Sequence, residues 1–215
     1  MINGNKCVQA KKMKRGKWGN HGARNQERGV IIVIKLLILF YCGSGKNYSE
    51  YDLSVMGGCF DERIIAGGDF AGNVFDAGVR GEGILSIDKN SPQNKFVKFI
   101  LGSDYQLSPK LYGMIEYQFN GEGKREKLNY EFARLQRGEI LNLSLNYLVI
   151  MFSYKITPLF TVPCTNNANL NEKSGYLSLA GDYSISENFY LHAGSQFTYG
   201  PKFSEYWYYP ASLYV

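Results

Sequence analysis

The chain lacks a long apolar run. No stretch reaches the roughly 18 consecutive apolar residues that a membrane-spanning helix needs. Its longest apolar stretch, residues 30–41, is interrupted by Lys35. The sequence therefore argues against a helical membrane protein. It remains compatible with a β-barrel, because only every second residue of a barrel strand faces lipid.

Residues that carry catalysis or bind metals are also scarce. The chain has two histidines, His21 and His192, and four cysteines, none of them in C-x-x-C spacing. No Cys/His pattern of a zinc site is present. Ser195 follows His192 by three residues, so the two side chains would point to opposite faces of a strand and make poor catalytic partners. We therefore expect no enzyme, no metal and no cofactor.

Positive charge is concentrated at the start of the chain. Most of the net charge of +5 comes from residues 1–28, which are rich in Lys and Arg, so we expect no nucleic-acid binding by the near-neutral remainder. The apolar residues 30–41 that follow are similar to the central region of a signal peptide, although no A-x-A cleavage site comes after them. An alternative is that this region is not native to the fold. We predict that residues 1–46 form a basic, mostly disordered extension with a short signal-like apolar segment.

Alternating patterns are abundant in the rest of the chain, together with 17 Tyr, 13 Phe and 24 Gly. From Tyr51 onward apolar and polar residues alternate with the period of two that is typical of β-strands. We count about ten such runs of roughly 9 to 17 residues, near the length that a tilted membrane strand needs. The residues expected to share an outward, apolar face include Leu111, Ile115, Tyr117, Leu177, Leu179, Phe189, Leu191 and Phe197.

Short and long connections alternate between these runs. The turns at Ser108-Pro109, at Thr157-Pro158 and at residues 186–188 are short, whereas residues 88–94, 122–139, 170–174 and 200–205 are longer. Sorting of loops by length is typical of outer-membrane barrels. We therefore expect the three short turns at one rim of the sheet. The connection at 122–139, with a short helix, is expected at the other rim.

Three segments depart from simple alternation. Residues 140–156 are long for one strand and change register, which predicts a bulge near Tyr147. The pair Gly67-Gly68 predicts a bend in a strand at residues 63–71, and a turn is expected at residues 73–75. The last run, residues 206–215, is expected to be an edge strand, because Pro210 cannot donate a ladder hydrogen bond.

Five motifs carry a resemblance to a known family. They are Tyr51-Asp-Leu-Ser54, residues 67–72 (GGDFAG), residues 77–82 (AGVRGE), residues 101–107 (LGSDYQL) and residues 112–123. Together they resemble the C-terminal half of porin-like outer-membrane proteins of Gram-negative bacteria, over about residues 47–215.

The resemblance implies an all-β fold, an antiparallel up-and-down transmembrane β-barrel in the cell outer membrane. It also implies an N-terminal half that is missing here, and a terminal aromatic residue where this chain has Val215. We therefore expect a fragment with an imperfectly closed sheet. Unpaired edges are costly in lipid, so we do not expect this chain to insert alone as a stable pore.

The leading hypothesis for the function is transport: a passive or weakly selective pore for small hydrophilic solutes, surrounded by outer-membrane lipid. The candidate lumen-lining residues are the charged ones on the polar face, namely Arg80, Glu82, Lys98, Asp104, Glu116, Asp182 and His192. Each is equally well explained as a charge that only satisfies its neighbour. The alternatives are a soluble or periplasmic β-sheet binding module and an outer-membrane enzyme. The sequence indicates neither the solute nor the oligomeric state.

Overall fold

The structure is a computed structural model that describes residues 44–48, 51–60 and 62–215. All of these residues belong to one compact unit, Leu37–Val215. The predictions made for the basic segment at 1–28 and for the apolar run at 30–41 lie outside the described residues.

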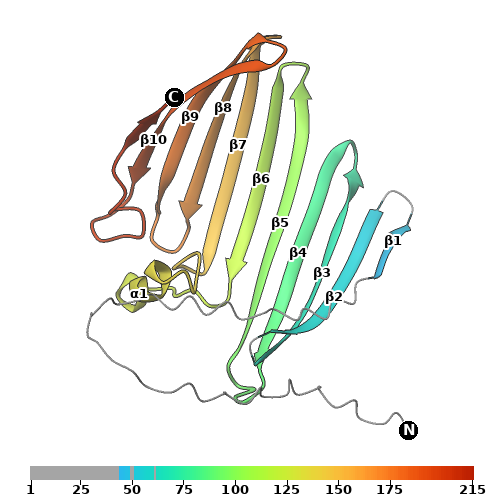
Figure 1. The fold of residues 1–215 in the computed structure, drawn as a ribbon, viewed down its shortest axis with the longest axis vertical. Helices are drawn as coiled ribbons and strands as arrows, with labels where there is room; N and C mark the ends of the chain where they lie inside the picture. Colours follow the sequence, from blue (N-terminus) through green and yellow to red (C-terminus); the bar gives the residue numbers. More distant parts are fainter. Residues whose placement is uncertain (1–43, 49–50, 61) are drawn as a thin grey trace, which may run out of the picture. The chain divides into compact units, whose positions relative to one another are not determined.

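The described residues form one antiparallel sheet whose eleven strands follow each other in chain order (Figure 1). The strands are β1 (Ser44–Tyr48), β2 (Tyr51–Phe60), β3 (Arg63–Val74), β4 (Ala77–Asp88), β5 (Lys95–Ser108), β6 (Leu111–Asn120), β7 (Asn146–Thr157), β8 (Phe160–Asn169), β9 (Ser174–Ser186), β10 (Phe189–Tyr199) and β11 (Ser212–Tyr214). This confirms the predicted all-β, antiparallel up-and-down architecture and the ten strands counted from Tyr51. β1 starts the sheet earlier, at Ser44. Within the described residues the edge strands β1 and β11 do not pair with each other.

Most of the short turns lie at one end of the strands and the long connections at the other, where the short connection between β2 and β3, which contains Glu62, also lies. Residues 75–76, 109–110, 158–159 and 187–188 make the turns at one rim. At the opposite rim lie residues 89–94, 121–145, 170–173 and 200–211. The connection 121–145 contains the short helices η1 (Lys127–Asn129) and α1 (Phe132–Gln136), and α1 lies at the lower ends of β6 and β7 in Figure 1. The predicted arrangement of turns and long loops is therefore confirmed.

The turn between β3 and β4 lies later than predicted. β3 continues to Val74, and the turn residues are Phe75 and Asp76, with φ of 48° and 66°. Positive φ at both central residues is the geometry of a two-residue hairpin turn that matches the twist of the flanking strands. The prediction of a turn at residues 73–75 missed it, because neither residue is the glycine or asparagine that usually marks such a turn. β3 passes through Gly67 and Gly68 without a register shift.

The predicted bulge near Tyr147 is wrong. β7 begins only at Asn146 and pairs with β6 in continuous register through Tyr147. Residues 140–145 belong to the connection, where Ile140 and Leu143 pack with Tyr130 in a small buried cluster. The change of register seen in the sequence is thus the boundary between a folded loop and a strand.

The last predicted strand is much shorter than expected. Only Ser212–Tyr214 pairs with β10, in register with Gly194–Gln196 of that strand. Residues 200–211, including Pro210, form the connection that precedes it. The aromatic residues of this segment therefore lie in a loop and not in a strand.

Candidate functional site

The strand register divides the sheet into two chemically different faces. Residues directly opposite each other on neighbouring strands share a face. What we call the apolar face carries large side chains that are exposed on strand after strand, among them Leu53, Phe70, Leu101, Ile115, Phe152, Leu179 and Phe197. All eight residues predicted to share an outward face lie on it. The opposite face, which we call the polar face, carries the charged side chains of the strands.

All seven predicted candidates lie on the polar face: Arg80, Glu82, Lys98, Asp104, Glu116, Asp182 and His192. The structure brings some of them together. The Arg80 guanidinium lies 2.7 Å from the Asp104 carboxylate, and Asp182 pairs with the ring of His192 directly across β9 and β10. Both pairs are partly exposed to solvent, so each contributes little to stability.

Three acidic side chains of the polar face have no cationic partner among the described residues. Asp69 lies directly opposite Glu82, and Asp69 accepts a hydrogen bond from the Ser54 hydroxyl. Glu116 accepts a hydrogen bond from Gln118 Nε2 at 2.7 Å. Like charges directly opposite each other are destabilising unless water or a cation screens them. Sequence reasoning missed Asp69, although the alternation of side chains along β3 places it on the same face as Arg63.

The connection 121–145 is attached to the polar face. Asn120 Nδ2 donates to the carbonyl oxygens of Asn142 and Ser144, both at 3.1 Å, and Lys98 Nζ lies 2.5 Å from Glu122. These contacts tie the beginning and the end of the connection to β5 and β6. The candidate Lys98 is therefore paired with the connection and is not a free charge on the polar face.

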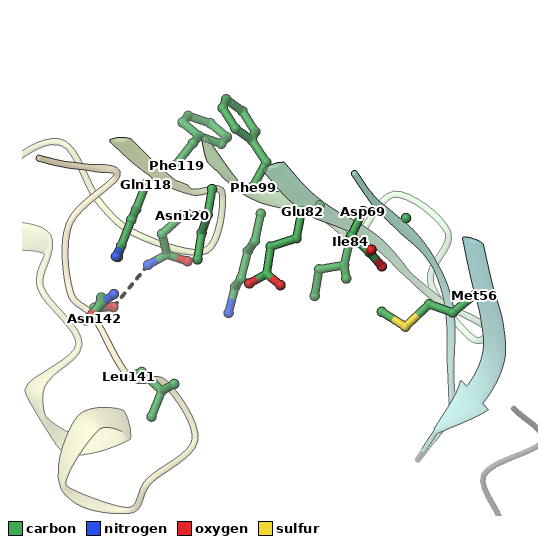
Figure 2. Close-up of a pocket in the computed structure, with 14 residues that line it drawn as sticks. Met56, Asp69, Glu82, Ile84, Phe99, Gln118, Phe119, Asn120, Leu141 and Asn142 are labelled. Atoms are coloured by element: carbon green, nitrogen blue, oxygen red, sulfur yellow. Dashed lines mark hydrogen bonds between the residues drawn. The ribbon is translucent and has the colours of Figure 1, made fainter. Parts of the chain in front are cut away.

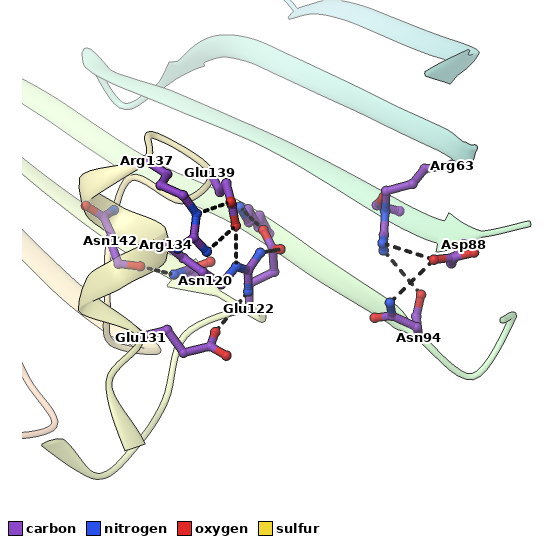
Figure 3. Close-up of polar contacts among 12 residues, drawn as sticks. Arg63, Asp88, Asn94, Asn120, Glu122, Glu131, Arg134, Arg137, Glu139 and Asn142 are labelled. Atoms are coloured by element: carbon purple, nitrogen blue, oxygen red, sulfur yellow. Dashed lines mark hydrogen bonds and ion pairs between the residues drawn. The ribbon is translucent and has the colours of Figure 1, made fainter. Parts of the chain in front are cut away.

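The connection also has an ion-pair network of its own, shown in Figure 3. Arg134 contacts the carboxylates of Glu122 at 3.2 Å, Glu131 at 2.9 Å and Glu139 at 3.2 Å. Its hydrogen bond to Glu131, more than any other contact, raises the pKa of the Arg134 guanidinium. The network holds α1 and both ends of the connection together.

A hollow of about 410 Å³ lies between the polar face and this connection (Figure 2). Glu82, Lys98 and Gln118 line it from the strands, and Leu141 and Asn142 line it from the connection. In Figure 2 the carboxylate of Glu82 points into this space. The site thus combines charged, amide and apolar groups, and it has room for water and small polar solutes.

The connection 200–211 reaches the same face through Glu205, which is only 5% exposed. The Glu205 carboxylate accepts hydrogen bonds from Leu143 N at 3.1 Å, from the Tyr147 hydroxyl at 2.8 Å and from Asn169 Nδ2 at 2.9 Å. Burial raises the pKa of the Glu205 carboxyl above its ordinary value. Sequence reasoning missed Glu205, and its only signal was an acid among the aromatics of residues 199–209.

The geometry bears on catalysis in two ways. Ser195 pairs with Leu179 on the apolar face, whereas His192 lies on the polar face, so this serine and histidine are on opposite sides of the sheet. The described part of the chain holds no group of three or more His, Cys, Asp or Glu residues that could bind a metal ion.

The described residues also form no helix that is long and apolar enough to span a membrane.

We compared the chain with protein-family models, with curated proteins and with solved structures, and none of these comparisons finds a match.

Proposed function

We propose that this sheet is the wall of an outer-membrane β-barrel of the porin-like class, acting as a passive or weakly selective pore for small hydrophilic solutes. The observation that carries the proposal is the two-sided sheet. One face exposes large apolar side chains on strand after strand, and the other is lined by charged and amide groups. Apolar area left in water costs about 25 cal/mol per Å², so a continuous apolar face calls for a cover. Lipid provides that cover on one side of a barrel while water fills the other.

Strand length supports the same proposal. β2 to β10 contain between 10 and 14 residues each. A tilted membrane strand needs about 9 to 11 residues. Four of the motifs behind the porin resemblance, residues 51–54, 67–72, 77–82 and 101–107, lie within β2, β3, β4 and β5. The resemblance therefore rests on strand segments of suitable length.

The polar face would form the lumen, narrowed by the connection 121–145 that lies over it. The Arg80–Asp104 pair is internally neutral and contributes little net charge. Asp69 and Glu82 line the hollow of Figure 2, and Glu116 lies elsewhere on the polar face. None of the three has a cationic partner among the described residues, so negative charge would dominate on this face. Rings of acidic side chains favour cations, and we expect a weak preference for cations over anions.

The edge strands set a condition on this proposal. Each unpaired backbone N–H or C=O group costs several kcal/mol in hydrocarbon. In a membrane, β1 and β11 would therefore have to pair with each other or with further strands. The proposal includes such pairing at both edges.

The lipid-facing assignment is tested with fluorophores attached to single cysteines, after the four native cysteines have been replaced. The label is placed at Leu179 on the apolar face or at Ser178, its neighbour on the polar face. In vesicles that contain brominated lipid, we expect strong quenching at position 179 and weak quenching at position 178. Equal, weak quenching at both positions, from a protein that stays monomeric without detergent, would favour the soluble binding module instead.

The pore itself is tested on the same vesicles, loaded with salt, a small sugar or a large dextran. We expect release of salt and sugar with retention of dextran, as diffusion through a water-filled lumen of limited width requires. Vesicles that retain all three solutes, although position 179 is quenched by lipid, would keep the membrane sheet and overturn the pore.

A further inference from the structure

The buried Glu205 joins three separate parts of the chain. Its carboxylate accepts from Leu143 in the connection 121–145, from Tyr147 in β7 and from Asn169 in β8. Glu205 itself belongs to the connection 200–211. One side chain thus holds two long connections against the polar face of the sheet.

The two connections make further contacts with each other, and together we call them the cover. The rings of Phe132 and Tyr208 meet edge to face with centroids 5.7 Å apart. Lys127 Nζ donates to the carbonyl oxygen of Lys202 at 3.1 Å. The cover is thus one packed structure, and Glu205 is one of its buried polar links to the strands.

A second carboxylate lies next to Glu205. Glu172, in the connection 170–173, accepts at Oε1 from Asn169 Nδ2 at 3.2 Å, from Ser174 Oγ at 2.9 Å and from the backbone N–H of Glu205 at 2.6 Å. Its other oxygen, Oε2, is buried without a hydrogen-bond partner. Asn169 Nδ2 is therefore shared between two carboxylates.

Within the part of the chain that the structure describes, the partners of this pair are neutral or acidic groups. The titratable groups that face Glu205 are Glu172 and the phenols of Tyr130, Tyr147 and Tyr206. Neither glutamate forms an ion pair with any Lys, Arg or His of the described residues. Burial raises the pKa of the Glu205 carboxyl, and the neighbouring Glu172 carboxylate adds to this effect because two like charges in one site repel each other.

We propose that the Glu172–Glu205 pair is a proton-operated latch, which holds the cover on the polar face while the pair keeps one proton and loosens the cover when that proton is lost. Loss of the proton leaves two negative charges that share the donor Asn169 Nδ2. The pH dependence follows from the raised pKa of the Glu205 carboxyl. A carboxyl whose pKa is raised in the folded state stabilises the fold fully at acid pH, and this stabilisation is lost as the pH rises through the raised pKa. The cover is therefore closed in acid and loosens toward neutral or alkaline pH.

The test uses the fluorescence of Trp207, which lies in the cover, in the full chain carrying Trp18→Phe and held in detergent. Quenching by acrylamide is measured between about pH 4 and about pH 9, a range that covers raised carboxyl and ordinary histidine pKa values. Trp207 is 47% exposed with the cover in place, and we expect its accessibility to acrylamide to rise further through one transition above the ordinary carboxyl range. An unchanged quenching constant across this range would overturn the latch.

Two variants and two controls assign the transition. Glu205→Gln should abolish it, because the variant has no second carboxylate to ionise, and Glu172→Gln should shift its midpoint to lower pH. Glu187→Gln, in a turn at the opposite rim, and His192→Gln should both keep the parent curve. A transition that persists unshifted in Glu172→Gln would overturn the latch, even where Glu205→Gln fails to fold. A transition that disappears in His192→Gln would assign it to the histidine and overturn the latch as well.

Discussion

The assignment of the two faces predicts opposite outcomes for arginine at two adjacent positions of β9. Leu179 lies on the apolar face, opposite Cys164 of β8 and Ser195 of β10, and its side chain is 46% exposed. It sits near the middle of β9, which runs over 13 residues, and so close to mid-membrane depth in the proposed barrel. Ser178 lies on the polar face, between Thr165 and Gln196.

The expected magnitude follows from this depth. An arginine at the bilayer midplane on the lipid face of a barrel costs about 2 to 4 kcal/mol. Since every 1.4 kcal/mol is a factor of ten, Leu179→Arg should lower the folding equilibrium by a factor of about 30 to several hundred. Ser178→Arg should cost much less, because its guanidinium would face water and lie among polar neighbours.

The assay is refolding from urea into lipid vesicles, with the folded fraction followed by the heat-dependent mobility shift on a gel. We expect the folding midpoint of Leu179→Arg to move to much lower urea, with Ser178→Arg close to the parent protein. Equal midpoints for the two variants would refute the assignment of the apolar face to lipid. Strong destabilisation by Ser178→Arg alone would reverse the two faces.

Two further predictions rest on individual contacts, and a third rests on the edge strands of the sheet. A Cβ at Gly81 would meet Phe70 Cε1 at 2.4 Å, so Gly81→Ala should destabilise the sheet by about 1 to 3 kcal/mol. Gly57→Ala, whose nearest contact is at 3.9 Å, should be tolerated in the same urea titration. Tyr147→Phe removes a donor from Glu205 and the acceptor of the Ser144 N–H, and the buried groups left unsatisfied should lower the free energy of unfolding by about 1 to 3 kcal/mol. In a planar bilayer we expect short-lived leakage of small ions but no discrete, long-lived conductance steps from this chain alone, because its edge strands β1 and β11 are not paired with each other. Such steps would show that β1 and β11 close the sheet.

Much of the fold is determined by the sequence alone, because it depends on local rules. A strand's side chains alternate with a period of two, so the face of Leu179 or Glu82 can be deduced from its neighbours without knowing the partner strand. The short turns at Ser108-Pro109 and Thr157-Pro158 require the two strands on either side of each turn to be antiparallel neighbours. The rim at which each longer connection lies follows from this arrangement. The meander, the faces of the seven candidates and the position of the long connection were therefore all predictable.

The candidate site and its cover were decided only by tertiary contacts. The pattern of residues 140–145 is compatible with a strand, and only packing of Leu143 with Tyr130 and Ile140 removes this segment from the sheet. Pairing of Arg80 with Asp104 depends on the register of two strands, which alternation leaves open in steps of two residues.

The burial of Glu205 has the same kind of cause. Its partners Leu143, Tyr147 and Asn169 lie between 36 and 62 residues away in the chain. No local pattern marks an acid that becomes buried by loops of distant origin. The residue types of the polar face follow from the sequence, whereas their partners and protonation depend on how the long connections fold back over the sheet.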